Sequence, residues 1–345
     1  MYIEEKRLAV PTVNSARPLQ KSPREKSWLM HFSRITSRSI IATVLLLSLS
    51  LVGCQAVQTA RLIRAYDTTL ASSDQTDTTV TRITAKRDRQ GRPARLLSAF
   101  YGLDDALPRP SNRVICDGAG GNDGMPVIFS HEIDVKTMQA GDFKVTTASS
   151  KTGRITCVTL APADDSGELR TVPFAGHYGS IEDQPVRVDV VGNVLSIDGK
   201  LNFKGSSIKV IPLEVGPTMI LAQNVPRGEL YLGRAATPLP WGGGSGCPVG
   251  TKTIVRVVWV GGVTKPGGDP ADEKEGARYK VTLTQANGKT IQVAPFALGD
   301  VGDGDNNHKL CLDVVGTPRS VSFPAGFLTD PREDLNPDTT IRVSR

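Results

Sequence analysis

The stretch Phe143-Lys144-Val145-Thr146 recurs as Tyr279-Lys280-Val281-Thr282, and this repetition indicates how the rest of the chain is divided. Two further matches follow in the same order. Pro-Phe-Ala stands at 173–175 and again at 295–297, and Asp-Val-Val-Gly stands at 189–192 and again at 313–316. Three short matches that keep their order favour an internal duplication over coincidence.

The composition of the chain favours strands over helices. Its 345 residues include 34 Gly and 23 Pro, while aromatic residues make up 5%. Short apolar stretches rich in Val, Ile and Thr are typical of strands. Several end at a dipeptide such as Asn287-Gly288 or Asp198-Gly199, which favours a two-residue hairpin turn. We therefore predict an all-β body, with strands near 125–129, 143–147, 155–160, 186–191, 208–213, 218–222, 253–260, 279–284, 290–294 and 309–315.

The spacing of the matches gives the expected domains. The first match lies 30 residues before the second in copy one (143 to 173) and 16 residues before it in copy two (279 to 295). The difference predicts a longer hairpin around 161–168 in copy one. The strand spacing suggests β-sandwiches. We predict two in tandem, one at 110–215 and one at 247–345, joined by a Gly- and Pro-rich linker at 216–246.

The first copy opens on a pattern known from other surface proteins. Met125-Pro126-Val127-Ile128-Phe129-Ser130-His131-Glu132-Ile133-Asp134, followed by Phe143-Lys144-Val145-Thr146, resembles the opening of bacterial Ig-like domains. The resemblance implies a module that serves as a spacer or a binding unit. It implies no catalytic residues.

The N-terminal part carries a second resemblance. The run Ile40 to Cys54 is apolar or small throughout, ends in Leu51-Val52-Gly53-Cys54, and follows Arg34 and Arg38. This order resembles a bacterial lipoprotein signal. The resemblance implies that the chain is cut before Cys54 and that the Cys54 thiol is acylated. The run of about 14 residues is shorter than the ~20 that a membrane-spanning helix needs, which argues against a permanent transmembrane anchor. The alternative to the signal is a buried helix with an incidental cysteine.

Removing the leader changes the charge of the chain. We expect residues 1–53 to be a signal peptide, in which Met30 is the true start and 1–29 are a wrongly assigned extension. This leader holds 8 of the 41 basic and 3 of the 35 acidic residues, which leaves 33 and 32. The mature chain is nearly neutral, so a nucleic-acid partner is not expected. Gln55 after the cysteine favours the outer membrane over the inner one, if the organism has both.

Residues 54–98 differ in composition from the body. Thr, Ser, Asp and Gln dominate 67–81, and charged residues dominate 86–95. A segment with so little apolar surface predicts a flexible tether. The alternative is that 80–85 pairs as an edge strand.

Four further cysteines are Cys116, Cys157, Cys247 and Cys311. In an exported chain they predict disulfides. Four cysteines allow three connectivities, and we favour Cys116 with Cys157 and Cys247 with Cys311 because each pair then closes within one copy. The long spacings argue against a zinc site.

The acidic loop Asp300 to His308 is the best candidate for site chemistry. Calcium is the one cofactor that the sequence suggests, since oxygen ligands that could hold it are offered by Asp300, Asp303, Asp305 and Asn307. The loop does not follow the EF-hand pattern. The alternative is a solvated acidic loop in which Asp and Asn form turns.

The sequence leaves two functions open. The favoured one is a non-enzymatic, lipid-anchored protein of the bacterial surface or periplasm that binds a protein or glycan or acts as a spacer. The other is an envelope hydrolase or glycan-active enzyme that uses the Asp300 to His308 loop. The glycine run 242–246 fits neither a nucleophile elbow nor a phosphate loop. Trp241 is the candidate aromatic platform for a glycan, and Trp259 is expected in the core.

Overall fold

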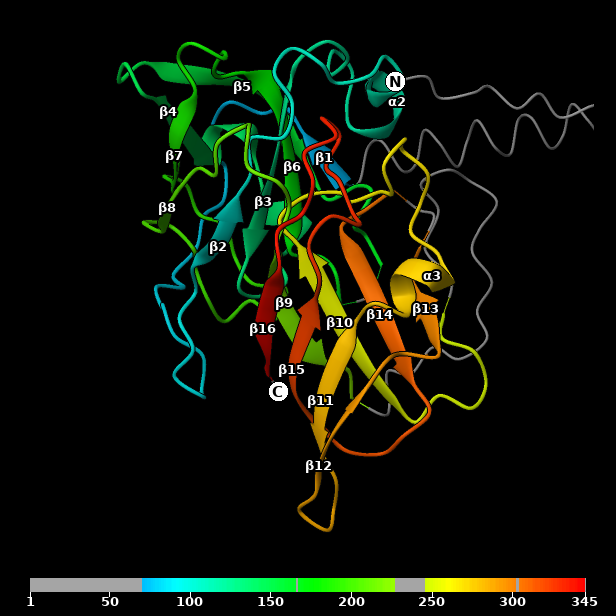
Figure 1. Cartoon of the computed structure of the whole chain (residues 1–345). Coiled ribbons are helices and arrows are strands. Elements are labelled where there is room, and N and C mark those ends of the chain that lie inside the picture. The colour runs from blue at the N-terminus through cyan, green and yellow to red at the C-terminus, as the bar shows by residue number, and fades with distance from the viewer. Residues whose placement is uncertain (1–69, 166, 227–245, 302–303, 345) are drawn as a thin grey trace, which may run out of the picture. The chain divides into compact units, whose positions relative to one another are not determined.

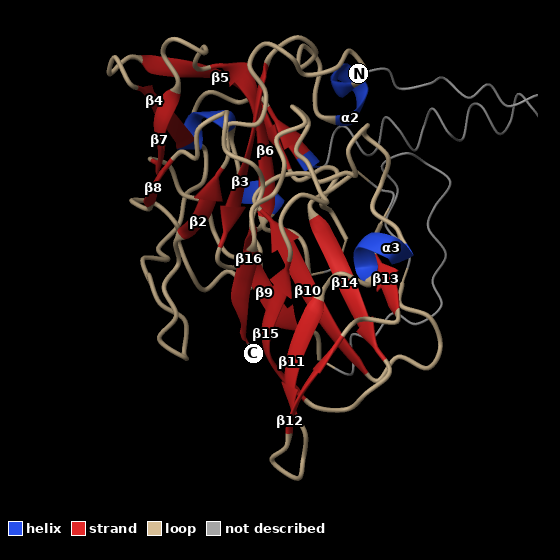
Figure 2. Ribbon diagram, in the orientation of Figure 1, coloured by secondary structure: helices blue, strands red, loops and turns tan. Residues whose placement is uncertain are grey.

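The computed structural model describes residues 70–165, 167–226, 246–301 and 304–344. All described residues belong to one compact unit of the chain, Val57–Arg345. The all-β prediction is confirmed: strands dominate the described residues, and helix is confined to single turns (Figure 2). These turns are α2 (Ser111–Val114), α3 (Glu273–Gly276) and the 3-10 turns η1 (Val135–Thr137) and η2 (Ala140–Asp142). No helix among the described residues is both long and apolar enough to span a bilayer.

The first half of the unit forms one eight-stranded sheet in the order β2-β3-β6-β5-β4-β7-β8, with β1 paired to β5. The strands are β1 (Ala71–Ser72), β2 (Leu96–Ala99), β3 (Asp123–Phe129), β4 (Phe143–Thr147), β5 (Thr152–Thr159), β6 (Thr171–His177), β7 (Pro185–Val190) and β8 (Ser207–Lys209). A parallel bridge between Phe100 and Ile211 joins the chain beyond β2 to the chain beyond β8. The sheet therefore curls until its two ends meet.

The second half forms another eight-stranded sheet, in the order β12-β11-β15-β16-β9-β10-β14-β13 (Figure 1). Its strands are β9 (Met219–Asn224), β10 (Thr253–Trp259), β11 (Lys280–Thr284), β12 (Thr290–Val293), β13 (Ala297–Gly299), β14 (Asn307–Leu312), β15 (Thr317–Phe323) and β16 (Thr339–Ser344). Because β9 belongs to this sheet, the second half of the unit begins inside the segment 216–246 that the sequence predicted as a linker.

The two sheets repeat one set of pairings. The pairs β2–β3, β3–β6, β4–β5, β4–β7 and β7–β8 of the first sheet have the counterparts β9–β10, β10–β14, β11–β12, β11–β15 and β15–β16 in the second. The parallel bridge of the first sheet has a counterpart in the parallel pair β16–β9. The sheets differ at β5, which pairs with both β4 and β6, whereas β12 and β13 are separate strands at opposite ends of the second sheet.

The sequence matches follow this correspondence only in part. Phe143 begins β4 and Tyr279 precedes β11, which are equivalent strands. The Pro-Phe-Ala match lies inside β6 in the first copy but at the start of β13 in the second. The Asp-Val-Val-Gly match ends β7 in the first copy and forms the β14–β15 connection in the second.

Each sheet encloses its own apolar core. The first core contains Phe129, Phe143 and Phe174, which contact each other edge to face or tilted. The second is built around Trp259 and Tyr279, both fully buried, so Trp259 lies in the core as predicted. Since each core lies within one continuous curled sheet, the two-layer sandwich predicted from the sequence is not confirmed.

The described part of the expected tether, from Leu70 onward, packs along the first sheet. The Gln75 side-chain amide donates to the Ile155 carbonyl at 3.2 Å. Asp77 accepts two hydrogen bonds from Asn193, at 3.0 and 2.9 Å. No strand forms at 80–85, and Val80 is fully exposed. The segment differs from a solvated tether because its polar side chains find partners on the sheet.

Candidate functional site

The predicted disulfides are formed, Cys116 with Cys157 and Cys247 with Cys311. The first links the chain after α2 to β5, and the second links the chain before β10 to β14. Each bond closes within one half of the unit, as the sequence favoured. Cys54, the predicted lipidation site, and Trp241 both lie outside the described residues.

The residues of the acidic loop have partners inside the protein. The Lys309 ammonium lies 2.9 Å from Asp300 Oδ1. Asp305 accepts hydrogen bonds from the backbone and side-chain amides of Asn307, both at 2.7 Å. Asp303 lies outside the described residues. Calcium binding by this loop therefore stays a prediction.

His308 is held away from solvent by a chain of hydrogen bonds. Trp259 Nε1 donates to the Tyr279 hydroxyl at 2.9 Å, and this hydroxyl is hydrogen-bonded to His308 Nδ1 at 2.7 Å. Burial lowers the pKa of His308 to about 4. The imidazole is therefore neutral near pH 7 and its Nδ1 atom is already engaged.

The acidic loop borders a small cavity of about 180 Å³, which Asp300, Asp305, Asn307 and His308 line together with apolar residues such as Val263. No carboxylate from another part of the described chain lines this cavity. The carboxylate from another segment that does approach the loop is Glu168, which lies close to Asp300 but does not line this cavity.

A buried cluster of charges, missed by the sequence reasoning, joins the two halves. Arg256 and Lys309 lie directly opposite each other on β10 and β14. Like charges in that register repel. Glu168 enters from the first half, with its Oε1 atom 3.1 Å from Lys309 Nζ and 3.4 Å from Arg256 Nε. Gly167 accepts a hydrogen bond from Arg256 Nη1 at 2.9 Å.

Glu168 stands at the end of the longer hairpin that the repeat spacing predicted. The Pro-Phe-Ala match behind that prediction does not fall on equivalent strands, and nothing in the sequence indicated the contacts of Glu168. Burial, together with the neighbouring Asp300 carboxyl, raises the pKa of Glu168 well above its usual value.

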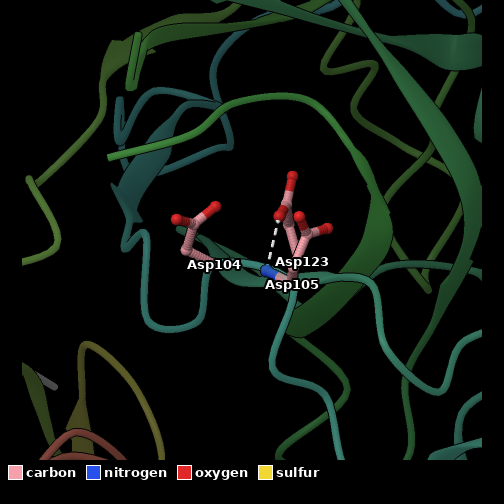
Figure 3. Close-up of side chains that lie close together, drawn as sticks. All are labelled: Asp104, Asp105 and Asp123. Atoms are coloured by element: carbon pink, nitrogen blue, oxygen red, sulfur yellow. Dashed lines mark hydrogen bonds between the residues drawn. The ribbon is translucent and has the colours of Figure 1, made fainter. Parts of the chain in front are cut away.

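Two groups of acidic side chains are close enough to share an ion, and neither fits a metal well. In Asp165, Glu168 and Asp300 the place of a cation is taken by Lys309, whose ammonium lies within 3.1 Å of two of the carboxylates. The other group is Asp104, Asp105 and Asp123 (Figure 3).

The buried carboxylate of Asp123 is hydrogen-bonded by backbone amides. Its carboxylate accepts a hydrogen bond from the Asp105 backbone amide at 2.9 Å (Figure 3). It accepts two more from the backbone amides of Tyr178 at 2.7 Å and Gly179 at 3.2 Å. Burial nevertheless raises its pKa. Three backbone donors give Asp123 a structural role, in which it fixes the chain after β6 against the loop before β3.

A polar cavity of about 590 Å³ lies beside the first sheet. Its wall includes His131 and Arg170, neither of which the sequence reasoning placed in a site. His131 Nδ1 lies 2.9 Å from Ser130 Oγ, and its Nε2 atom lies 3.3 Å from Asp88. His177, the remaining histidine of the body, is exposed and lies 3.3 Å from Asp105. The polar cavity is therefore a candidate site for a ligand.

Comparison with known proteins adds little to this description. No protein-family model matches the chain, and no curated protein matches it. Among solved structures, the chain is similar to the crystal structure of the N-terminal part of the bacterial S-layer protein SbsC, with 12% identity and a TM-score of 0.25. The match covers 73% of this chain and 44% of that one, so it spans less than half of the S-layer fragment. A TM-score this low supports no inference about fold or function.

Proposed function

We propose that this chain is a lipid-anchored protein of the bacterial cell envelope whose β units bind a ligand and do not catalyse a reaction. The anchor is the lipid on Cys54, in the outer membrane if the organism has one. The two halves act as a tandem pair of Ig-like modules that hold the binding surface outside the membrane.

The observation that carries the proposal is the pair of disulfides, Cys116–Cys157 and Cys247–Cys311. Disulfides persist in oxidising compartments outside the cytosol. The lipoprotein resemblance at Leu51 to Cys54 points independently to the same place. Two unrelated features of the chain thus support export.

Binding is favoured over catalysis by the state of the candidate catalytic groups. His308 Nδ1 is engaged by Tyr279, and Asp300 faces Lys309. The polar cavity beside the first sheet, by contrast, is lined by side chains that recognise charge and hydroxyl groups. This arrangement supports a role in recognition.

The proposal is tested by expressing the full chain and its Cys54→Ser variant in a bacterium supplied with labelled palmitate. We expect the wild type to be labelled and shortened, and Cys54→Ser to be unlabelled and uncut. Thr59→Ser, a matched hydroxyl substitution beyond the proposed cleavage point, should behave as the wild type. Absence of label from the wild type, or equal labelling of Cys54→Ser, would overturn the proposed anchor.

A further inference from the structure

The polar cavity has the size and the wall of a small-ligand site. Its volume of about 590 Å³ lies within the range of ligand pockets. Five segments distant in sequence form it: the turn around Asp88, the chain after β3, Arg170 just before β6, the turn around Asp198, and Gln223 of β9. A cavity built from separate segments keeps its shape only when the protein is folded.

The charges on the wall favour an anion. The lining contains five cationic side chains and three acidic ones: Arg87, Arg89, Arg92, Arg170 and Lys200 against Asp88, Glu132 and Asp198. Two of the acids are already paired, Asp88 with Arg92 and Asp198 with Lys200. Glu132 is the remaining acid of the wall, and its negative charge disfavours the binding of an anion.

Arg170 is a buried cation whose side chain is only partly satisfied. It is only 5% exposed, and its one hydrogen bond among the described residues runs from Nη1 to the Ser130 carbonyl at 3.2 Å. Its Nε atom has no hydrogen-bond partner, and Glu132 and Glu168 interact with it electrostatically without a direct ion pair among the described residues. A buried guanidinium without a carboxylate is unfavourable, and an oxyanion in the cavity would supply the missing acceptor.

The wall around Arg170 is fixed before any ligand arrives. The Arg170 carbonyl accepts a hydrogen bond from Phe129 at 2.8 Å, which continues the pairing of β3 with β6. Ser130 Oγ donates to the Pro93 carbonyl at 3.0 Å and accepts from the Arg95 amide at 3.1 Å. A preformed site loses less conformational entropy on binding.

We propose that this cavity binds the oxyanion of a small polar ligand, with Arg170 as its principal contact. The proposal rests on the binding role proposed above and names the ligand class for it. A carboxylate on an acidic sugar and a phosphate group share the required chemistry, since both match the planar fork of an arginine.

The test is calorimetric titration of the detergent-extracted full chain with three probes: galacturonate, inorganic phosphate and neutral galactose. We expect galacturonate or phosphate to bind and galactose to bind at least about tenfold more weakly, because the neutral sugar leaves Arg170 unpaired. The stronger of the two anionic probes identifies the source of the oxyanion. Failure of both to bind would overturn the proposal.

Variants separate the Arg170 contact from general charge attraction. Arg170→Lys keeps the charge but loses the fork, and we expect it to weaken binding about tenfold. Arg89→Gln removes the charge of an exposed side chain at the rim of the cavity. Because this side chain is not part of the core, the variant should fold, and we expect it to weaken binding by a few fold. Arg113→Gln, an exposed arginine on α2 outside the cavity, is the matched control and should bind as the wild type.

Equal affinity in the wild type, Arg170→Lys and Arg89→Gln would overturn the proposal even if an anion binds. This outcome is distinguishable from failure of the anchor, because the titration does not depend on whether Cys54 carries lipid.

Discussion

At the scale of single residues, the buried His308 makes the stability of the second half depend on pH. Its pKa is about 4 in the folded chain, below the usual value of 6.5. Its contribution is fully present above pH 6.5 and is lost as the pH falls toward 4, because only the unfolded state binds the proton in that window. The loss amounts to about 3 kcal/mol over the whole window.

This prediction is checked by urea unfolding of the wild type and His308→Gln at pH 7.5, 5.5 and 4.5. Glutamine can still accept the hydrogen bond from Tyr279, so the variant should fold but lose the His308 part of the pH dependence. The exposed His177→Gln is the control and should follow the wild type. If the wild type and His308→Gln lose stability in parallel on acidification, the burial of a neutral imidazole is disproved.

Residue-level prediction from sequence succeeded where one residue type implies one chemistry. In a chain that is expected to be exported, cysteines are expected to form disulfides, and the sequence left open only their connectivity. Apolar Trp259 in an apolar strand is buried. The burial of Glu168 and Arg170 was not predicted, because a charged residue is expected at the surface. Its burial depends on partners that are distant in the sequence.

At the scale of elements, the hairpin that ends at Glu168 holds the two halves together through a cluster of buried charges. Removing one partner of such a cluster leaves the others uncompensated, which costs about 3 to 5 kcal/mol. Lys309→Met leaves Glu168 and Asp300 without their shared ammonium, so we expect a loss of this size in the free energy of unfolding. The exposed Lys289→Met on the β11–β12 turn is the matched control.

A double-mutant cycle shows whether the effect comes from the cluster. Glu168→Gln should cost less in the Lys309→Met background than in the wild type, since one of its partners is then absent. Strictly additive effects on the free energy of unfolding would contradict a direct interaction between Glu168 and Lys309.

The segment from Leu70 to Arg95 gives a second prediction at this scale. A Cβ atom added to Gly141 would lie 2.1 Å from the Gln75 carbonyl oxygen. If the segment is docked, Gly141→Ala is overpacked and should cost about 1 to 3 kcal/mol. If the segment is a free tether, the same change should be neutral or stabilise by about 0.4 to 1 kcal/mol, because alanine restricts the unfolded chain.

Thermal unfolding and limited proteolysis measure this difference. Docking predicts a lower melting temperature for Gly141→Ala and faster cleavage between residues 70 and 95. Gly262→Ala is the control, because an added Cβ there meets its nearest atoms at an ordinary 3.7 Å. An unchanged melting temperature and unchanged cleavage in Gly141→Ala would contradict docking.

At the scale of the whole molecule, the sequence predicted the strand content and the division into two related halves. The duplication is visible in structure as a common set of strand pairings, although only the match at Phe143 and Tyr279 falls on equivalent strands. The sandwich architecture could not be read from strand spacing, since spacing does not say whether a sheet curls around its own core or packs on another. Which strand pairs with which is fixed by contacts between residues that are far apart along the chain.

At this scale, the location of the protein and the ligand that it is proposed to recognise rest on different features of the chain. The leader resemblance and the disulfides concern the location of the protein, and the polar cavity concerns what it recognises. The cavity was invisible in sequence because its wall comes from segments as distant as Asp88 and Gln223. The sequence alone contains no sign of such a site beyond an excess of arginines at 87–95.

The most direct test of the account is the intact mass of the membrane-extracted chain, measured with and without reduction. The account predicts a chain that begins at Cys54, carries acyl groups, and gains the mass of four hydrogen atoms on reduction as two disulfides open. A chain that retains its leader, or one that starts at Cys54 but has four free thiols, would contradict it.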